Sequence, residues 1–178
     1  MSANALISTL KFDLPDYDIV PITKQNCEQV MDVFESNQAF FLLTEGTPAT
    51  LQGCQANVGA IPPNFDIHNK LYLGFWKNNR CIATLDFLLG YPNPDCIYIG
   101  LFLVHEELHG TGLGRKIMET LFAASKNIKF NGANLAVIEN NKNAIAFWEK
   151  LGFKETGKSI ATLHDSLEAN VITMSLNM

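Results

Sequence analysis

A buried strand that runs through three glycines into an amphipathic helix limits this chain to few architectures. Residues 96–104 (CIYIGLFLV) are continuously apolar, which is typical of a strand covered on both faces of a sheet. A short polar turn follows, and residues 112–126 then place Leu113, Ile117 and Leu121 at helical spacing. We therefore expect the strand at the centre of a sheet, with a helix leaving its carboxyl end.

The glycines at this turn are Gly110, Gly112 and Gly114. Because they lack Cβ atoms, a ligand can approach the main chain, and the first helical turn offers unpaired N–H groups at the positive end of its dipole. Such a site suits a pyrophosphate. The spacing fits neither a Walker loop nor a dinucleotide fingerprint. Three glycines alone are equally well explained by a turn that lets helix and strand pack closely.

The rest of the chain predicts strands alternating with helices, after a polar lead. We expect strands at 19–22, 71–76, 81–89, 135–138, 153–156 and 172–176, and helices at 24–35 and 143–151. Thr23 is the expected cap of the first helix, and Thr47-Pro48 starts a further helical turn in the irregular segment 37–69. Asn78-Asn79 closes a hairpin, and Gly152 ends the last helix. The class is mixed α/β.

Length and composition favour one folded unit. At 178 residues, the chain corresponds to a single domain, 1–178, and its 47% apolar content can supply a core. The chain has 13 Lys and Arg residues and 18 Asp and Glu residues, which gives a net charge of −5. Nucleic acid is therefore not an expected partner, because phosphate-backbone binding needs clustered cations.

The cysteines and the hydropathy pattern favour the cytoplasm. Cys27, Cys54, Cys81 and Cys96 are far apart and form no C-x-x-C pair. Residues 1–12 carry no signal-peptide pattern, and the longest apolar run is half the length of a membrane-spanning helix. We expect a cytoplasmic protein with no membrane partner.

Residues 105–109 read HEELH, the two-histidine motif of zinc proteases. Zinc binding there needs both histidines on one helical face with the glutamate beside them. A strand runs up to Val104 and a glycine follows His109, which leaves too little chain for such a helix. Arg115 also stands where the longer motif has a third histidine. We expect no metal, and stoichiometric zinc in the purified protein would overturn this.

Two segments in order resemble the GNAT superfamily of acetyl-CoA-dependent N-acetyltransferases. In the first, Val104, His109, Gly112 and Gly114 stand at the family spacing, with histidine in place of Arg or Gln. The second resembles N-x-x-A-x-x-F-Y-x-K-x-G-F through Asn141, Ala144, Phe147, Trp148, Lys150, Leu151, Gly152 and Phe153. The close resemblance covers about residues 96–156.

The resemblance implies a GNAT-like acyl-CoA transferase fold: a central mixed, mostly antiparallel sheet of six to seven strands flanked by about four helices. The sheet would open beside its fourth strand, and the pantetheine arm of acetyl-CoA would lie there like an extra strand. The implied cofactor-binding residues are Phe102, Leu103, Val104, His109, Gly110, Thr111, Gly112, Leu113, Gly114, Arg115, Asn141, Ala144, Phe147 and Trp148. At His109 we expect the main-chain group to matter more than the ring, with Arg115 or Lys116 supplying positive charge.

The implied reaction moves an acetyl group to a primary amine of a small molecule or peptide, by direct attack in a ternary complex and without a metal. An ammonium with a pKa of about 10.4 must first lose a proton. Candidate bases are Asp86, which interrupts an apolar strand, and Glu106, just past the central strand. Glu45 and Glu139 are alternatives, although a carboxylate at a segment end is more often a solvated surface group.

Trp148 departs from the family segment, because a tyrosine there commonly protonates the departing sulfur. An indole N–H donates a hydrogen bond but keeps its proton at neutral pH. Tyr98 on the central strand is a substitute donor, although core packing is its commoner role. The same departure leaves open an alternative function, that of a catalytically silent acyl-CoA-binding domain.

Exposed strand edges would permit a homodimer.

Overall fold

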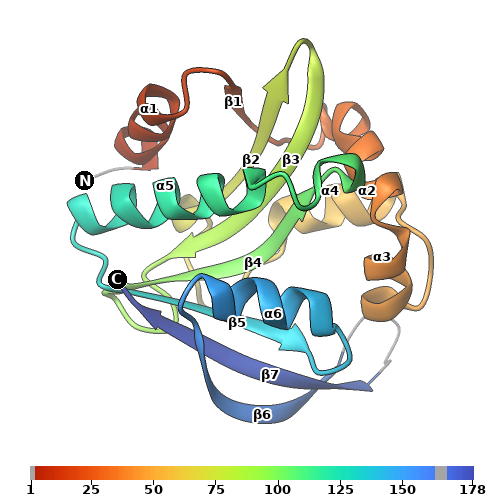
Figure 1. Cartoon of the computed structure of the whole chain (residues 1–178), viewed down its shortest axis with the longest axis vertical. Helices are drawn as coiled ribbons and strands as arrows, with labels where there is room; N and C mark the ends of the chain where they lie inside the picture. Colours follow the sequence, from red (N-terminus) through yellow and green to blue (C-terminus); the bar gives the residue numbers. More distant parts are fainter. Residues whose placement is uncertain (1–2, 163–167) are drawn as a thin grey trace.

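The computed structural model describes residues 3–162 and 168–178, and within them seven strands form one sheet (Figure 1). The strands are β1 (Asp18–Pro21), β2 (Lys70–Lys77), β3 (Arg80–Leu89), β4 (Cys96–Val104), β5 (Gly132–Ile138), β6 (Lys154–Thr162) and β7 (Glu168–Asn177). The helices are α1 (Ala3–Asp13), α2 (Met31–Ser36), α3 (Gln38–Glu45), α4 (Leu51–Gly59), α5 (Leu113–Asn127) and α6 (Lys142–Lys150). Short 3-10 turns are η1 (Cys27–Val30), η2 (Ile67–Asn69) and η3 (Glu106–Leu108).

The strand order is β1-β2-β3-β4-β5-β7-β6, and every neighbouring pair is antiparallel except β4 and β5, which are parallel. The predicted mixed α/β class with a mostly antiparallel sheet is therefore confirmed.

Several local predictions are confirmed by the backbone. Asn78 and Asn79 take positive φ values of 52° and 62° in the β2–β3 turn. The helix α5 begins after Gly112, and α6 begins after Asn141, whose Oδ1 accepts a hydrogen bond from Ala144 N at 3.1 Å. Gly152 has φ +94° just past α6.

The two faces of the sheet carry separate cores. On one face α1 and α5 pack side by side, with α6 beside them (Figure 1). The other face is covered by η1 and the helices α2 to α4. The sequence predicted no helix before residue 19, but α1 places Leu6, Leu10 and the following Leu14 at 0% exposure in the first core.

The segment between β1 and β2 differs most from the prediction. The helix predicted over 24–35 is confirmed only from Met31, where α2 begins. The cap at Thr23 is wrong, because the 3-10 turn η1 comes first and follows Asn26, whose Oδ1 accepts a hydrogen bond from Thr23 N at 2.7 Å. A start at Thr47-Pro48 is also wrong, because α4 is capped by Thr50, whose Oγ1 accepts from Gly53 N at 3.0 Å. The intervening helix α3 was not predicted.

A β-bulge in β4 positions the opening of the sheet. Asp86 pairs with Leu101 and Phe87 pairs with Ile99, so Gly100 has no partner on β3. On its other side, β4 pairs with β5 only from Cys96 to Ile99. Beyond Ile99 the two strands diverge, as the ribbons show (Figure 1).

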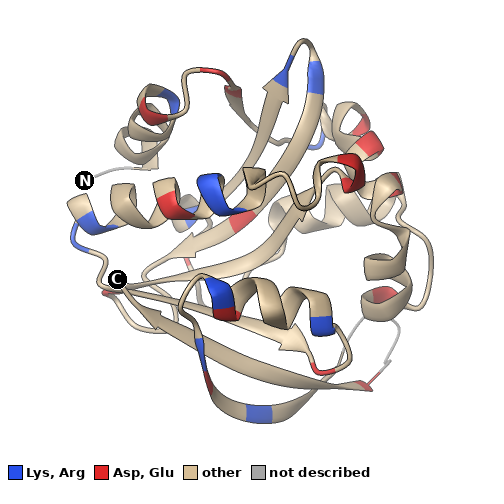
Figure 2. Cartoon of the chain, in the orientation of Figure 1, with Lys and Arg blue, Asp and Glu red and all other residues tan. Residues whose placement is uncertain are grey.

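Acidic and basic residues are interspersed along the helices and strands (Figure 2). Among the described residues, no helix has both the length and the apolar character to cross a membrane.

Candidate active site

The opening between β4 and β5 leads into a cavity of about 1710 Å³. Its walls come from β4, β5, the turn between β4 and α5, the start of α6, and the helix α3 on the other side. Ligand pockets commonly measure about 300–1,000 Å³, so this cavity has room for a large ligand together with a second one.

The edge of β4 that faces β5 is unpaired from Gly100 to the end of the strand, which leaves main-chain groups available to an extended ligand. The carbonyl oxygen of Val104 is the exception, because it is not available to a ligand. That oxygen already contacts Asn37 Nδ2 at 3.0 Å and His109 Nε2 at 2.8 Å. Among the three strand residues predicted to bind the cofactor, Phe102 therefore retains the freer backbone. His105 N donates to Ile82 O, so the alternating ladder also turns the main-chain groups of Leu103 toward β3.

The glycine loop, defined here as residues 109–115, has the features of an anion site. Gly110 and Gly112 have φ values of +77° and +88°, and a Cβ at either would meet no described atom within 4 Å. The amides of Gly110, Gly112, Gly114 and Arg115 donate no hydrogen bond within the described chain. Four N–H groups thus remain free at the start of α5, where the helix dipole favours negative charge.

Gly114 has a different role from the other two glycines. A Cβ there would lie 3.3 Å from the Phe147 ring and 3.5 Å from the Phe102 ring. The two rings are stacked with centroids 6.0 Å apart. Gly114 therefore allows α5 to start close to β4 and α6, while Gly110 and Gly112 keep the loop open.

Trp148 lies on α6 and forms part of the cavity wall. It is 8% exposed, and its ring centroid is 4.9 Å from Phe147 and 5.3 Å from Phe153. Asn141 and Ala144 at the start of α6 also line the cavity. The second family segment thus contributes one wall, next to the glycine loop.

Asp86 lies on β3 in the cavity wall, opposite the bulge at Gly100. Its Oδ2 is 2.5 Å from Lys70 Nζ, and its Oδ1 is buried without a hydrogen-bond partner among the described residues. Burial raises the pKa of Asp86 to about 6, although the Lys70 charge acts in the opposite direction. A carboxylate with one free oxygen and such a pKa can accept a proton near neutral pH.

The other predicted acid and base candidates separate into two groups. Tyr98, Glu106 and Glu45 line the same cavity as Asp86. Burial raises the pKa of Tyr98, whose ring contacts Tyr91 at 5.4 Å between centroids. Glu106 is exposed. Glu139 pairs with Lys158 at 2.6 Å and does not line the cavity, although its neighbours Ile138 and Asn140 do.

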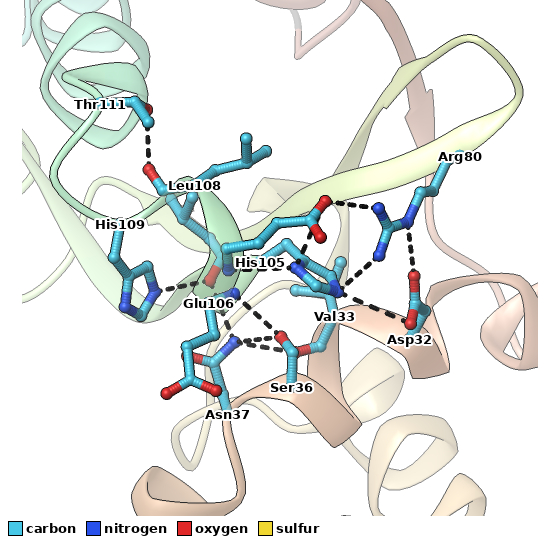
Figure 3. A network of polar contacts seen from close by, with 12 residues as sticks. Asp32, Val33, Ser36, Asn37, Arg80, His105, Glu106, Leu108, His109 and Thr111 are labelled. Atoms are coloured by element: carbon cyan, nitrogen blue, oxygen red, sulfur yellow. Dashed lines mark hydrogen bonds and ion pairs between the residues drawn. The ribbon is translucent and has the colours of Figure 1, made fainter.

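The two histidines of HEELH bind different partners (Figure 3). His105 Nε2 lies 2.8 Å from Arg80 Nη2 and 3.6 Å from Asp32 Oδ1. The His109 ring turns away to the Val104 carbonyl. No group of three or more His, Cys, Asp or Glu that could hold a metal exists within residues 3–162 and 168–178.

A polar network anchors the turn before the glycine loop to α2 and β3 (Figure 3). Arg80 Nε contacts Asp32 Oδ2 at 2.7 Å, and Arg80 Nη1 contacts Glu107. Glu106 N donates to Ser36 Oγ at 3.1 Å. Sequence reasoning missed Asp32, Ser36, Arg80 and Lys70, because each partner lies at least 16 positions away and no local pattern signals the pairing.

Comparisons with known proteins agree with this geometry. A family model, described as the acetyltransferase (GNAT) family, matches residues 30–153. Protein SPT10 of Saccharomyces cerevisiae is 29% identical over 90 residues, which are 49% of this chain and only 14% of that protein.

Solved structures show the same fold. An acetyltransferase from Thermus thermophilus superposes with a TM-score of 0.73 at 21% identity, covering 91% of this chain and 97% of the other. The ribosomal-protein-S18-alanine N-acetyltransferase from Escherichia coli gives a TM-score of 0.64 at 17% identity, covering 90% and 93%. With the family model spanning most of its length, the chain belongs to the GNAT acetyltransferase family.

Proposed function

We propose that this protein moves an acetyl group from acetyl-CoA to a primary amine of a small molecule or peptide, with residues 1–178 forming one acetyltransferase domain. The observation that carries the proposal is the glycine loop, whose four free amides lie beside an opened sheet. An anion site next to an unpaired strand edge suits a ligand with a diphosphate and an amide-bearing arm.

In this proposal the cofactor contacts come mainly from main-chain groups. The unbonded amides of the glycine loop, those of Gly110, Gly112, Gly114 and Arg115, face the diphosphate, and the free edge of β4 at Phe102 faces the pantetheine amides. The His109 ring and the Arg115 side chain have partners of their own, Val104 O and Glu119 at 2.7 Å. Fixed backbone dipoles therefore contribute more than side-chain charge.

Asp86 is the base that the geometry supports best. The proton of the incoming ammonium passes to Asp86 Oδ1, and the freed lone pair attacks the thioester carbonyl carbon. The nitrogen then loses its second proton to solvent, the carbon–sulfur bond breaks and the thiolate leaves, with Tyr98 or solvent donating a proton to sulfur. A thiol pKa of about 8.5 makes this leaving group tolerable without a strong acid. No covalent enzyme intermediate is needed.

One observation favours a second candidate function, a silent acyl-CoA-binding domain. Trp148 occupies the position of the family tyrosine and packs among aromatic rings. Its indole cannot release a proton at neutral pH. Binding of coenzyme A without acetylation of any amine would favour this candidate, whereas turnover would reject it.

Calorimetry with coenzyme A tests the proposed anion site. We compare Thr111→Glu with Thr111→Gln, because both lose the Thr111 Oγ1 contact to Leu108 O at 2.7 Å and only one adds negative charge. We expect the Glu variant to bind at least about tenfold more weakly than the Gln variant, which corresponds to roughly 1.4 kcal/mol. Equal affinities, or no binding by the unaltered protein, would contradict the proposal. Thiol release with a panel of amines then tests the transfer itself.

A further inference from the structure

Lys70 reaches the candidate base from the neighbouring strand. It lies at the start of β2, where Tyr72 pairs with Asp86, so Lys70 and Asp86 are diagonal neighbours across the two strands. Lys70 Nζ lies 2.5 Å from Asp86 Oδ2 and donates a second hydrogen bond to Ala60 O at 2.9 Å. The side chain is only 4% exposed, so its charge is held away from water.

The ion pair of Lys70 and Asp86 is unusual because only one of the two carboxylate oxygens has a partner. Asp86 Oδ2 has its ion partner, but Oδ1 is buried and has none among the described residues. Buried polar atoms are nearly always hydrogen-bonded, and exceptions are concentrated where a ligand or a reaction completes the site. Both residues line the cavity, together with Ala60 at the end of α4. The unsatisfied oxygen thus belongs to a residue of the cavity wall, although Oδ1 itself is covered from solvent.

We propose that Lys70 is a positioning residue, which holds Asp86 by Oδ2 so that Oδ1 faces the acceptor amine in an ionised, proton-accepting state. The inference rests on the proposed function. Removing the ammonium would leave a buried carboxylate without its counter-ion, free to rotate and easier to protonate. In this role Lys70 acts through Asp86 and not on the substrates directly.

The groups around Asp86 determine the direction of the pH effect. From β2 it faces Lys70 and the buried Tyr72, and from β4 the uncharged Gly100 and Leu101. Tyr98 and Glu45 line the same cavity. Burial raises the pKa of Asp86 to about 6 and Lys70 limits this rise, so loss of the Lys70 charge raises the pKa further. Below its pKa, Asp86 is protonated and cannot take a proton from the amine.

The test compares Lys70→Gln, which keeps a hydrogen-bond donor, with the control Lys77→Gln, which removes a charge from the exposed end of the same strand. Carbon-13 NMR follows the Asp86 carboxyl through a pH titration of the unliganded full chain, with Asp86→Asn for assignment. We expect the midpoint to rise by about 1–3 pH units in Lys70→Gln and to stay unchanged in Lys77→Gln.

The acid limb of kcat/KM for acetylation should move with the NMR midpoint, and Lys70→Arg should restore both. A fold check by circular dichroism accompanies each variant. If the NMR midpoint of Asp86 does not move in Lys70→Gln, Lys70 does not control the pKa of Asp86. If the midpoint moves but the acid limb of kcat/KM does not, Lys70 does not position the catalytic base. If the unaltered protein acetylates no amine, the proposed function fails and the inference with it, while the titration still reports the ion pair separately.

Discussion

At residue scale, the chemistry depends on side chains whose surroundings set their protonation. Asp86 was predictable as a candidate because a charge in an apolar strand needs a partner or a cavity. The structure gives it both: Lys70 pairs with one oxygen, and the residue lies in the wall of the cavity. Lys70 could not be predicted, because a lysine at the start of a strand is ordinarily a solvated end group.

Asp86→Asn should lower kcat by about 10²–10⁴-fold, since the amide cannot accept the proton, while coenzyme A affinity by calorimetry stays the same. In the unaltered protein, the rate should fall as pH decreases through about 6, because protonation of Asp86 removes the base. The kcat of Glu106→Gln is measured in parallel. A larger fall in kcat for Glu106→Gln than for Asp86→Asn would identify the exposed Glu106 as the base instead of Asp86.

Trp148→Tyr should keep or raise turnover, because a phenol can protonate the departing sulfur where the indole cannot. The smaller ring leaves space beside Phe147 and Phe153, so we expect a loss of about 1–3 kcal/mol in the free energy of unfolding. Steady-state kinetics and denaturant unfolding check the two effects. A large fall in kcat with the fold intact would show that the indole has a role of its own.

At element scale, strands with continuous apolar runs were predicted well and short helices poorly. The bounds predicted for β4, residues 96–104, are those of the structure, because Asp95 and His105 end the apolar run. The helix α3 was missed because short helices depend on packing rather than propensity. Its Phe41 stacks on Phe34 of α2 with centroids 5.1 Å apart, a contact that no periodicity reveals.

The turn between β4 and the glycine loop is held by the end of α2 through Asn37, whose Nδ2 donates to Val104 O at 3.0 Å. Asn37→Ala removes this bond and loosens the turn, so we expect coenzyme A to bind about fivefold more weakly, the equivalent of about 1 kcal/mol. Calorimetry measures the affinity, and Asn177→Ala at the end of β7 is the control. Unaltered affinity in Asn37→Ala would show that the loop keeps its shape without α2.

At the scale of the whole molecule, the two family segments made the architecture predictable. They cover only part of the chain, so elements outside them could not be predicted in the same way. The resemblance covered about residues 96–156, which include the cavity wall formed by β4, the glycine loop and α6. The helix α1 lies outside it, and its leucines at every fourth position meet α5 only once the sheet has brought both helices to one face. Its burial is a tertiary effect that local pattern alone could not predict.

Leu10→Ala should lower the free energy of unfolding by about 2–5 kcal/mol, because a fully buried side chain leaves a cavity between α1 and the sheet. Phe12→Ser on the same helix is the control, since Phe12 is 84% exposed. Urea denaturation measures both. A loss below about 1 kcal/mol in Leu10→Ala would show that α1 contributes little to the folded state.

The unpaired Gly100 also decides which half of the molecule each later residue of β4 belongs to. Ile97 and Ile99 join the core under α1 and α5, and after the extra residue it is Phe102 and Val104 that do so, while Leu101 and Leu103 join the opposite core. If Gly100 paired regularly with β3 instead of bulging out, every later side chain of the strand would point to the opposite side of the sheet. The bulge thus lets β4 carry one residue more than β3 while its side chains still supply both interiors of the molecule.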